Sequence, residues 1–292
     1  MQEAILYRKL NNKNTQCHLC NHFCLIKNND LGKCWVRKNI DGVLFSLNYG
    51  KIIAEHIDPM EKKPLYHYLP GTFTYSIAAA GCNFRCRHCQ NADISQIKNN
   101  PDLVGGKIIE KTAQNVVAEA IKNNCPSISY TYTEPTIFAE FALACMKLAK
   151  KNNFKNIWVS NGYMSKECLE IIAPYLDACN IDLKFFREKS YNEICGAKLK
   201  PVLDNLIWLK ARKIHLEITT LIIPTLNDSE KELSDIANFM AQKLGPETPW
   251  HVSAFYPAYR LINLPATRPD LVLKAQKIGQ KAGLNYVYTG NI

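Results

Sequence analysis

Short apolar runs recur along the chain after residue 72, and longer amphipathic segments separate them. The runs are rich in Ile, Val and Tyr, which is typical of strands. They predict strands at residues 75–80, 127–132, 156–160, 178–183, 215–223 and 251–255. The segments between them predict helices at residues 109–123, 137–152, 165–175, 201–212 and 228–243, with Ser165 and Asp228 at two helix starts.

Strands that alternate with helices at this spacing predict parallel pairing with right-handed crossovers. Six such units are fewer than the eight that close a complete barrel. We therefore expect an α/β fold, an open and partial (β/α)6 barrel. In barrels of this kind the chemistry lies at the C-terminal ends of the strands, so the polar residues that follow the strands are the first functional candidates.

The first 72 residues lack this alternation. Residues 43–57 predict two short strands around a turn at Tyr49-Gly50. Residues 58–72 carry three prolines and a glycine, which predict an ordered linker rather than an element. We therefore expect a small N-terminal segment with its linker at residues 1–72 and the barrel at residues 73–292.

The composition is that of a globular protein, because 47% of the residues are apolar and 21% are charged. A chain of 292 residues can bury one large α/β core. The net charge of +10 comes largely from lysines scattered in short runs, which lack the interleaved aromatic residues of a nucleic-acid stacking platform. Solvated helix faces explain these lysines better than an RNA or acidic partner does.

The start of the sequence has no secretory apolar region, and no apolar run approaches the length that spans a membrane. The twelve cysteines fall into clusters rather than into a disulfide ladder. In a chain of this length, such clusters favour metal binding in a reducing compartment. The sequence therefore predicts a cytoplasmic protein with metal sites and no membrane partner.

Three cysteines follow the first predicted barrel strand in the segment GCNFRCRHC. Cys82, Cys86 and Cys89 have the spacing C-x3-C-x2-C. Three thiolates are one too few for a closed tetrahedral site or for a fully protein-ligated [4Fe–4S] cluster. A centre held this way keeps one coordination position open for a substrate. A zinc loop and buried free thiols are the structural alternatives.

Four further cysteines lie near the N-terminus with the spacing C-x2-C-x3-C-x9-C. They are Cys17, Cys20, Cys24 and Cys34. Four soft ligands can saturate a tetrahedral ion, so the segment predicts a closed structural site. Metal binding would supply folding free energy to a segment too short to form its own core. Zinc and a second [4Fe–4S] cluster fit the same ligand set.

Polar residues also follow the other predicted strands. Glu134 comes just after the second strand and precedes a proline, which suits a carboxylate that binds a cation. Ser160 and Asn161 end the third strand at a tight turn whose Gly162 permits close backbone approach. A solvated loop glutamate is the structural alternative for Glu134.

The fourth predicted strand reads Asn-Ile-Asp-Leu-Lys. Alternation places Asn180, Asp182 and Lys184 on one face. A carboxylate and an ammonium group facing the barrel lumen are costly unless they are paired or bound to a ligand, so a structural ion pair is the alternative. The sixth strand begins with His251, another candidate for the lumen.

The triplet C-x3-C-x2-C after a strand resembles the signature of the radical S-adenosylmethionine (SAM) enzymes. The resemblance implies that Cys82, Cys86 and Cys89 bind a [4Fe–4S] cluster whose fourth iron is chelated by the amino and carboxylate groups of SAM. Reductive cleavage of SAM would then give a 5′-deoxyadenosyl radical that abstracts hydrogen. The family usually has an aromatic residue that contacts adenine before the third cysteine, and here that residue is His88.

Two further motifs carry the resemblance. Tyr-Thr-Glu-Pro at residues 132–135 is similar to the family's Gly-Gly-Glu-Pro-like motif, which implies that Glu134 binds the SAM ammonium. Asp-Leu-Lys at residues 182–184 resembles the SAM- and radical-handling motif of glycyl-radical-enzyme activases, in which the lysine reaches the SAM carboxylate. The resemblance therefore implies catalytic and cofactor-binding roles for Asp182 and Lys184.

The resemblance also concerns other residues at the C-terminal ends of the barrel strands. Ser160 and Asn161 are further cofactor-binding candidates, since they end the next strand of the expected barrel. His251 corresponds loosely to an activase histidine near the SAM ribose, and a buried structural histidine is the alternative.

Two branches of the family are similar to this chain. The rim motifs resemble pyruvate formate-lyase activating enzymes, oxidoreductases that abstract hydrogen from a glycine of a large partner enzyme. The block EKKPLYH, the four-cysteine start and GCNFxCxxCQN resemble the AmmeMemoRadiSam-system enzymes, for which the alternative is a protein or RNA target and a Memo-like partner. The resemblance implies an external reductant, flavodoxin or ferredoxin, and we expect a protein substrate. Members of the second branch often continue into a cysteine-bearing tail, so either that tail is dispensable or the chain is incomplete at Ile292.

A hypothesis from a different class is a non-catalytic iron–sulfur or zinc RNA-binding protein, suggested by the positive charge and the N-terminal cysteines. It predicts tight, salt-sensitive RNA binding that is independent of SAM. It gives no reason for the residues at the strand ends, so we rank it below the enzyme. The five remaining cysteines lack ligand spacing and are expected to be buried, although Cys195 would be catalytic if it faced the lumen.

Overall fold

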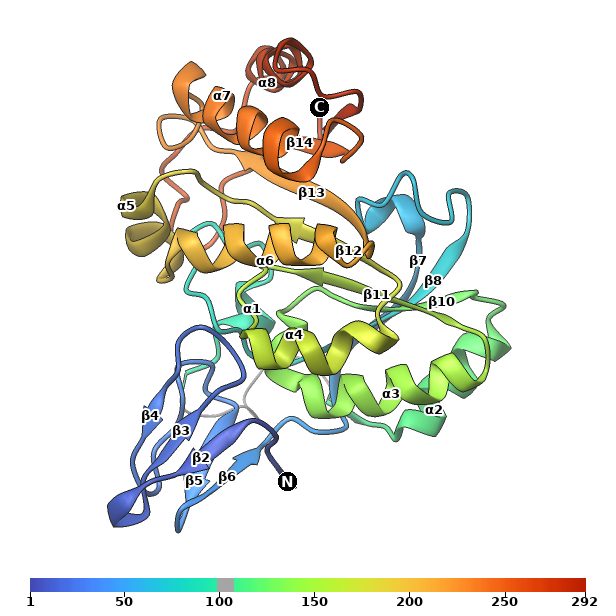
Figure 1. Ribbon diagram of the computed structural model, residues 1–292, viewed down its shortest axis with the longest axis vertical. Helices are drawn as coiled ribbons and strands as arrows, with labels where there is room; N and C mark the ends of the chain where they lie inside the picture. The colour runs from blue at the N-terminus through green and yellow to red at the C-terminus, as the bar shows by residue number, and fades with distance from the viewer. Residues whose placement is uncertain (99–107) are drawn as a thin grey trace. The chain divides into compact units, whose positions relative to one another are not determined.

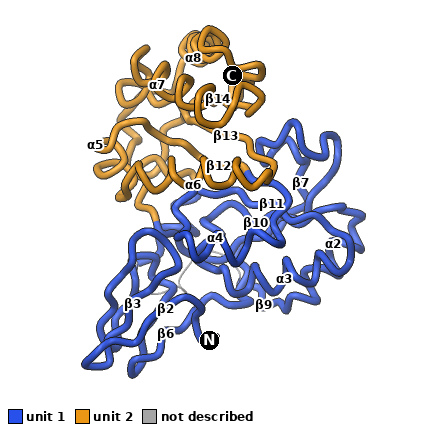
Figure 2. Tube along the Cα trace, viewed as in Figure 1, with its two compact units in different colours: residues 1–83, 91–179 blue, residues 84–90, 180–292 orange. Residues whose placement is uncertain are grey.

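The strands predicted from the apolar runs are present in a computed structural model of the chain, which describes residues 1–98 and 108–292. Two compact units make up the structure (Figure 2). The first contains residues 1–83 and 91–179, and the second contains residues 84–90 and 180–292. The chain therefore changes unit just after Cys82, within the cysteine triplet. The expected boundary between residues 72 and 73 falls inside the first unit.

The N-terminal part of the first unit consists of short strands in two three-stranded antiparallel sheets. One sheet has the order β2-β3-β4, formed by Tyr7–Lys9, Thr15–Cys17 and Leu25–Ile26. The other has the order β1-β6-β5, formed by Gln2–Glu3, Val43–Ser46 and Arg37–Ile40. Arg37 anchors this part through a buried ion pair of 2.5 Å with Glu140 of helix α3 (Ala139–Lys151).

The larger sheet of the first unit has the order β9-β7-β8-β10-β11, and its strands β7, β8, β10 and β11 are labelled in Figure 1. Strands β8 (Phe73–Ala79), β10 (Ser127–Tyr130) and β11 (Lys155–Ser160) are parallel, as predicted. Strand β7 (Lys51–Pro59) runs antiparallel to β8, and β9 (Ile109–Glu110) runs antiparallel to β7. Nearly every residue of β8 and β10 is buried, as expected for strands that are covered on both faces.

Helices follow the parallel strands of this unit, and two of them, α2 and α4, begin with side-chain caps. Helix α2 (Ala113–Lys122) begins with a capping box between Thr112 and Asn115. Helix α4 (Lys166–Ile172) begins at Ser165, whose hydroxyl accepts a hydrogen bond from the Cys168 N–H, which confirms the predicted start. The shorter elements are α1 (Ala92–Ser95) and the 3₁₀ turns η1 (Asn11–Lys13), η2 (Met60–Lys62), η3 (Pro135–Phe138) and η4 (Ala173–Tyr175).

The second unit continues the alternation with strands in the order β12-β13-β14-β15. Strand β12 (Ala178–Asp182) enters this unit at Asn180, and β13 (His215–Ile222), β14 (Trp250–Ala254) and β15 (Val287–Gly290) are parallel to one another. The sequence did not predict β15. The helices of the second unit are α5 (Glu188–Ser190), α6 (Leu199–Ala211), α7 (Glu230–Phe239) and α8 (Pro269–Lys281). Two π-helical turns, η5 (Tyr191–Cys195) and η6 (Met240–Leu244), complete the unit.

Close packing in this unit depends on a glycine in α8. A Cβ atom on Gly279 would lie 2.9 Å from the Trp250 ring and 2.9 Å from Val287, so only glycine lets the helix approach β14 and β15 this closely. Helix α7 begins after Ser229, one residue later than predicted. Within residues 1–98 and 108–292, no helix combines the length and the hydropathy that a membrane span requires.

Candidate active site

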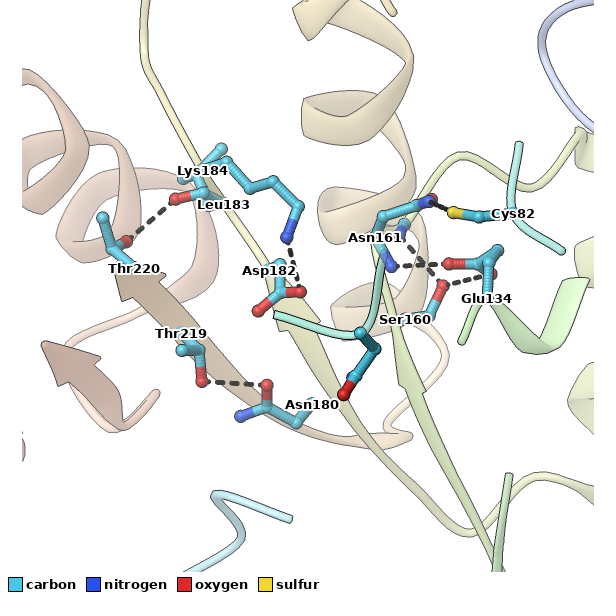
Figure 3. A network of polar contacts seen from close by, with 12 residues as sticks. Cys82, Glu134, Ser160, Asn161, Asn180, Asp182, Leu183, Lys184, Thr219 and Thr220 are labelled. Atoms are coloured by element: carbon cyan, nitrogen blue, oxygen red, sulfur yellow. Dashed lines mark hydrogen bonds and ion pairs between the residues drawn. The ribbon is translucent and has the colours of Figure 1, made fainter. Parts of the chain in front are cut away.

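In the first unit, the carboxylate of Glu134 lies at the centre of a network of polar contacts (Figure 3). Oε1 accepts hydrogen bonds from the Thr136 N–H at 3.0 Å and from the Ser160 hydroxyl at 2.8 Å. Oε2 accepts one from the Asn161 N–H at 2.8 Å. The predicted residues Glu134, Ser160 and Asn161 are thus brought together, and the carboxylate fixes the turn after β11.

The electrostatics of Glu134 are unusual for a buried acid. The residue is 2% exposed, and burial raises its pKa although its hydrogen bonds oppose the shift. Its donors are all neutral, and no basic side chain of residues 1–98 or 108–292 forms an ion pair with it. A buried carboxylate without a cation is costly, and Oε2 has acceptor capacity left. The position therefore suits a cationic ligand.

The turn after β11 also contacts the start of the cysteine triplet. The Asn161 side-chain amide donates to Asn83 Oδ1 at 2.7 Å and lies 3.9 Å from Cys82 Sγ. Gly81, with φ of +103°, has no room for a side chain, because a Cβ atom would lie 3.0 Å from the Cys34 carbonyl oxygen. The Cys82 thiol is therefore placed by a glycine turn and by the same asparagine that Glu134 holds.

In the second unit, Asp182 and Lys184 form an ion pair, with Lys184 Nζ 2.8 Å from Asp182 Oδ2 (Figure 3). Their side chains are 34% and 17% exposed. Asp182 and nearby thiols raise the Lys184 pKa well above its usual value, although burial opposes this. The pair is self-neutralised, as the structural alternative predicted, and Lys184 remains a partly exposed cation with a fixed position.

Two neighbouring side chains fix the backbone around this pair. The Asn227 side-chain amide donates to the Lys184 carbonyl at 2.9 Å, and the Lys184 N–H donates to the Tyr191 hydroxyl at 3.3 Å. Asn227 and Tyr191 were not among the residues predicted from the sequence. An Asn-Asp pair after a strand was the available signal for Asn227, whereas the role of Tyr191 depends on tertiary structure.

The second unit also holds Cys86 next to Cys195, in η5. The backbone brings them together, because the Arg85 N–H donates to the Cys195 carbonyl at 2.8 Å and the Arg87 N–H donates to the Ile194 carbonyl at 2.9 Å. A hydrogen bond from the Cys195 thiol lowers the Cys86 pKa, against the effect of burial and with help from Lys184. Cys195 was expected to be catalytic if it faced the barrel lumen; the structure places it in contact with Cys86, and its catalytic role stays a prediction.

His88 is buried in the second unit against Phe185, with ring centroids 6.2 Å apart. Burial, and then the charge of Lys184, lowers its pKa to about 3, so the ring is neutral at physiological pH. Its Nδ1 atom is buried and has no hydrogen-bond partner in the described chain. An unsatisfied buried ring nitrogen is rare and is consistent with a ligand contact at this position.

His251 belongs to a separate polar network in the second unit. Its Nε2 lies 2.6 Å from one oxygen of the fully buried Glu217, and His215 Nε2 lies 2.9 Å from the other. The His251 ring also stacks on Tyr288, with centroids 5.4 Å apart. These contacts give His251 a structural role, and its expected contact with the SAM ribose stays a prediction.

The four N-terminal cysteines line one small cavity in the first unit, together with His22, Lys33 and Arg37. Burial raises the pKa of Cys34 to about 11 and that of Cys20 well above its usual value, and neighbouring thiols add to both shifts. The four predicted ligands thus line the same cavity. Within residues 1–98 and 108–292, however, no three His, Cys, Asp or Glu side chains are grouped as ligands of one metal ion.

The donor chemistry fits the groups that the sequence implies. A cluster with three protein ligands needs thiols, and the triplet segment supplies three, one of which, Cys86, has a lowered pKa. In the second unit the orphaned Nδ1 of His88 suits a polar ligand, and in the first unit the uncompensated charge of Glu134 suits a cationic one. The residues present therefore suit an iron–sulfur cluster and SAM.

Comparison with known proteins identifies relatives along the whole chain. Residues 76–239 match the family model described as "Radical SAM superfamily". The chain is 43% identical to the protein MJ0808 of Methanocaldococcus jannaschii, over 100% of this chain and 86% of that protein. It is 22% identical to a pyruvate formate-lyase-activating enzyme of Clostridium pasteurianum, over 55% of this chain and 66% of that enzyme. The crystal structure of QueE from Escherichia coli has a similar fold, with a TM-score of 0.52, 13% identity and coverage of 82% and 92%.

Proposed function

Because the chain belongs to the radical SAM superfamily, we propose that it is an activating-enzyme-like oxidoreductase that removes a hydrogen atom from a protein substrate. The observation that carries the proposal is Glu134, a buried carboxylate beside the Cys82 turn whose charge is uncompensated. SAM has an ammonium group that would neutralise it. The relatives named as activating enzymes support this branch rather than an RNA-binding protein without catalysis.

Cys82, Cys86 and Cys89 would hold a [4Fe–4S] cluster, and the open position would take SAM. When bound, this cofactor pair supplies reductive cleavage of SAM and a radical that abstracts hydrogen. An external one-electron donor, a flavodoxin or a ferredoxin, would supply the electron. What the chain itself contributes is the placement of SAM and of the substrate.

Each proposed SAM contact has its own supporting geometry. Glu134 binds the SAM ammonium group, and Ser160 and Asn161 hold the Glu134 carboxylate in place. Lys184 binds the SAM carboxylate, and Asp182 keeps the lysine charged and oriented. His88 offers its free Nδ1 to the adenine ring, so a polar contact replaces the usual aromatic one.

A surface loop of the second unit supports a protein substrate. Tyr256, Tyr259 and Ile262 are exposed there. The loop is attached to the triplet segment, because the Arg260 N–H donates to the Arg87 carbonyl at 2.9 Å. Tyrosine, arginine and exposed aliphatic side chains are typical of protein-binding surfaces. A polypeptide bound to this loop would lie next to the segment that carries Cys86.

The experiment for the central assignment uses two variants, each of which replaces one cysteine. After anaerobic reconstitution and reduction, the wild type should convert SAM to 5′-deoxyadenosine. Cys86→Ala should abolish this reaction, whereas Cys145→Ala, which changes a buried thiol of α3, should retain it. Equal turnover by the wild type and by Cys86→Ala would refute the assignment.

We further propose that Cys17, Cys20, Cys24 and Cys34 hold a separate metal centre, because all four line one cavity. Its ligand set fits zinc or a second [4Fe–4S] cluster, and its role is to stabilise the N-terminal sheets. In a variant that lacks Cys82, Cys86 and Cys89, metal analysis should still find zinc, or iron with sulfide. A metal-free variant with unchanged thermal stability would contradict this site.

A further inference from the structure

The block EKKPLYH, residues 61–67, has no role in the function proposed above. In the structure its Lys63 is buried, with a 2% exposed side chain, and Lys63 Nζ lies 2.5 Å from Asp58 Oδ2. Burial lowers the Lys63 pKa to about 8, and Asp58 opposes this shift. Asp58 also pairs with the exposed Lys62 at 2.8 Å and accepts a hydrogen bond from the Tyr132 hydroxyl. One buried carboxylate therefore gathers three donors.

Tyr132 is the residue that these contacts constrain. Its φ is +62°, in the left-handed region that bulky side chains rarely adopt. The Lys63 ammonium lies 4.4 Å from the centre of its ring, a cation–π contact. The Tyr132 carbonyl accepts a hydrogen bond of 2.7 Å from the Asn91 side chain. Such backbone strain persists only where surrounding contacts enforce it, and it is concentrated at functional sites.

The strained residue lies two positions before Glu134, in a tight turn. The Thr133 N–H donates to the Thr131 carbonyl at 2.8 Å, and the Thr133 hydroxyl donates to the Ala79 carbonyl at 2.6 Å. Because the turn is short and bonded at both ends, a change in the position of Tyr132 is transmitted to Glu134. The contacts of Asp58 and Lys63 therefore reach the carboxylate that we assign to the SAM ammonium.

We propose that Asp58 and Lys63 are positioning residues for SAM binding, which act through Tyr132 to hold the turn of residues 131–134 in the conformation that presents Glu134. The inference rests on the proposed role of Glu134. It gives the block EKKPLYH a function in cofactor binding, through the contacts of Lys63 with Asp58 and Tyr132.

The first unit contains a matched set for comparison. The Tyr75 hydroxyl donates to Glu55, and Lys111 Nζ lies 2.5 Å from the same carboxylate. The lysine also lies 5.5 Å from the centre of the Tyr75 ring. The groups are of the same kind, although Lys111 Nζ also donates to the Tyr75 hydroxyl at 2.9 Å, and Tyr75 lies within strand β8 rather than in the turn before Glu134. Tyr75→Phe therefore serves as a control for the loss of a tyrosine hydroxyl that bonds to a carboxylate outside this turn.

The test measures SAM affinity, cluster content and thermal stability in Tyr132→Phe and Tyr75→Phe. Tyr132→Phe keeps the ring over Lys63 and removes the hydrogen bond to Asp58. The Kd for SAM should rise about three- to tenfold, the range expected for one lost hydrogen bond. Iron and sulfide content should stay at the wild-type level. Tyr75→Phe should change the Kd less than about twofold.

A double-mutant cycle with Glu134→Gln separates the proposal from a general loss of stability. If Tyr132 acts through Glu134, Tyr132→Phe should have no further effect on SAM affinity in the Glu134→Gln background. Additive losses would overturn the inference, as would wild-type affinity in Tyr132→Phe when Glu134→Gln alone weakens binding. Wild-type affinity in Glu134→Gln would instead overturn the ammonium site and, with it, this inference.

Discussion

Asp58 and Glu134 are two buried carboxylates of the same unit, each 2% exposed, and their surroundings are opposite. Asp58 is paired with Lys62 and Lys63 and accepts a tyrosine hydroxyl. These hydrogen bonds lower the Asp58 pKa even though burial alone would raise it. Glu134 accepts its hydrogen bonds from neutral groups, and burial raises its pKa. One carboxylate has its cations in the chain, and the other has none there.

The difference indicates which carboxylate serves the fold and which serves a ligand. A buried charge needs a counter-charge, because desolvation costs several kcal/mol per ion. Asp58 obtains its counter-charges when the chain folds, so they offset the desolvation free energy of its carboxylate in the absence of ligand. Glu134 is well hydrogen-bonded but uncompensated, so a cationic ligand such as SAM completes its environment. Tyr132 connects the two, since its side chain contacts Asp58 and its backbone leads to Glu134.

The largest expected effect comes from removing the Asp58 charge. Asp58→Asn leaves the buried Lys63 ammonium without its partner, and loss of one partner of a buried pair costs about 3–5 kcal/mol. Chemical denaturation at pH 7 measures the change in the free energy of unfolding. In the ligand-free protein Glu134→Gln removes a charge that has no cation, so its cost should be clearly smaller. Equal losses in the two variants would remove the distinction between these carboxylates.

A second prediction concerns the pH dependence of SAM binding. The raised pKa of Glu134 means that the ligand-free protein holds a proton on this carboxylate at pH values where an exposed glutamate has lost it. Only the charged form attracts an ammonium group. SAM affinity should therefore increase as the pH rises through this pKa, by at most about tenfold per pH unit for one linked proton, and then level off.

In the ligand-free protein the same pKa shift affects stability with a defined sign. A glutamate with a raised pKa in the folded state contributes stability below its unfolded pKa of about 4.3 and loses it as the pH rises through the folded value. Calorimetric titration of SAM, begun at the ordinary glutamate pKa of about 4.3 and continued upward until the affinity levels off, would measure the affinity change in the wild type and in Glu134→Gln. A flat profile in the wild type, or the same slope in both proteins, would contradict the assignment.

Much of the fold was predictable, because apolar runs and helical spacing are local signals. All six predicted barrel strands are present, and Ser165 caps the helix that it was expected to begin. Strand β15 was missed because its four residues give too short a run. The four N-terminal cysteines were identified from spacing alone; they line one cavity, and their metal site stays a prediction.

The connections between motifs could not be predicted, because they depend on tertiary contacts. Without the family resemblance, Lys63 would be assigned to the surface, yet its side chain is buried in an ion pair with Asp58. The position of Cys195 beside Cys86 depends on backbone pairing between residues 85–87 and η5, for which spacing gives no signal. The sequence identified Glu134, but only the structure shows that its bonding partners are neutral.

The smallest expected effect separates the two lysines that share Asp58. Lys62 and Lys63 are adjacent and both pair with the carboxylate, but the Lys62 side chain is 63% exposed. An exposed ion pair contributes less than about 1 kcal/mol, since water screens it and the side chain loses entropy. Lys62→Ala should therefore leave the free energy of unfolding and the SAM affinity close to wild type. Lys63→Met, measured in parallel, should weaken SAM binding, because the buried ammonium holds Asp58 and the Tyr132 ring together. If Lys62→Ala matched Lys63→Met in both measurements, net charge near Asp58, rather than the buried contact to Tyr132, would control the turn.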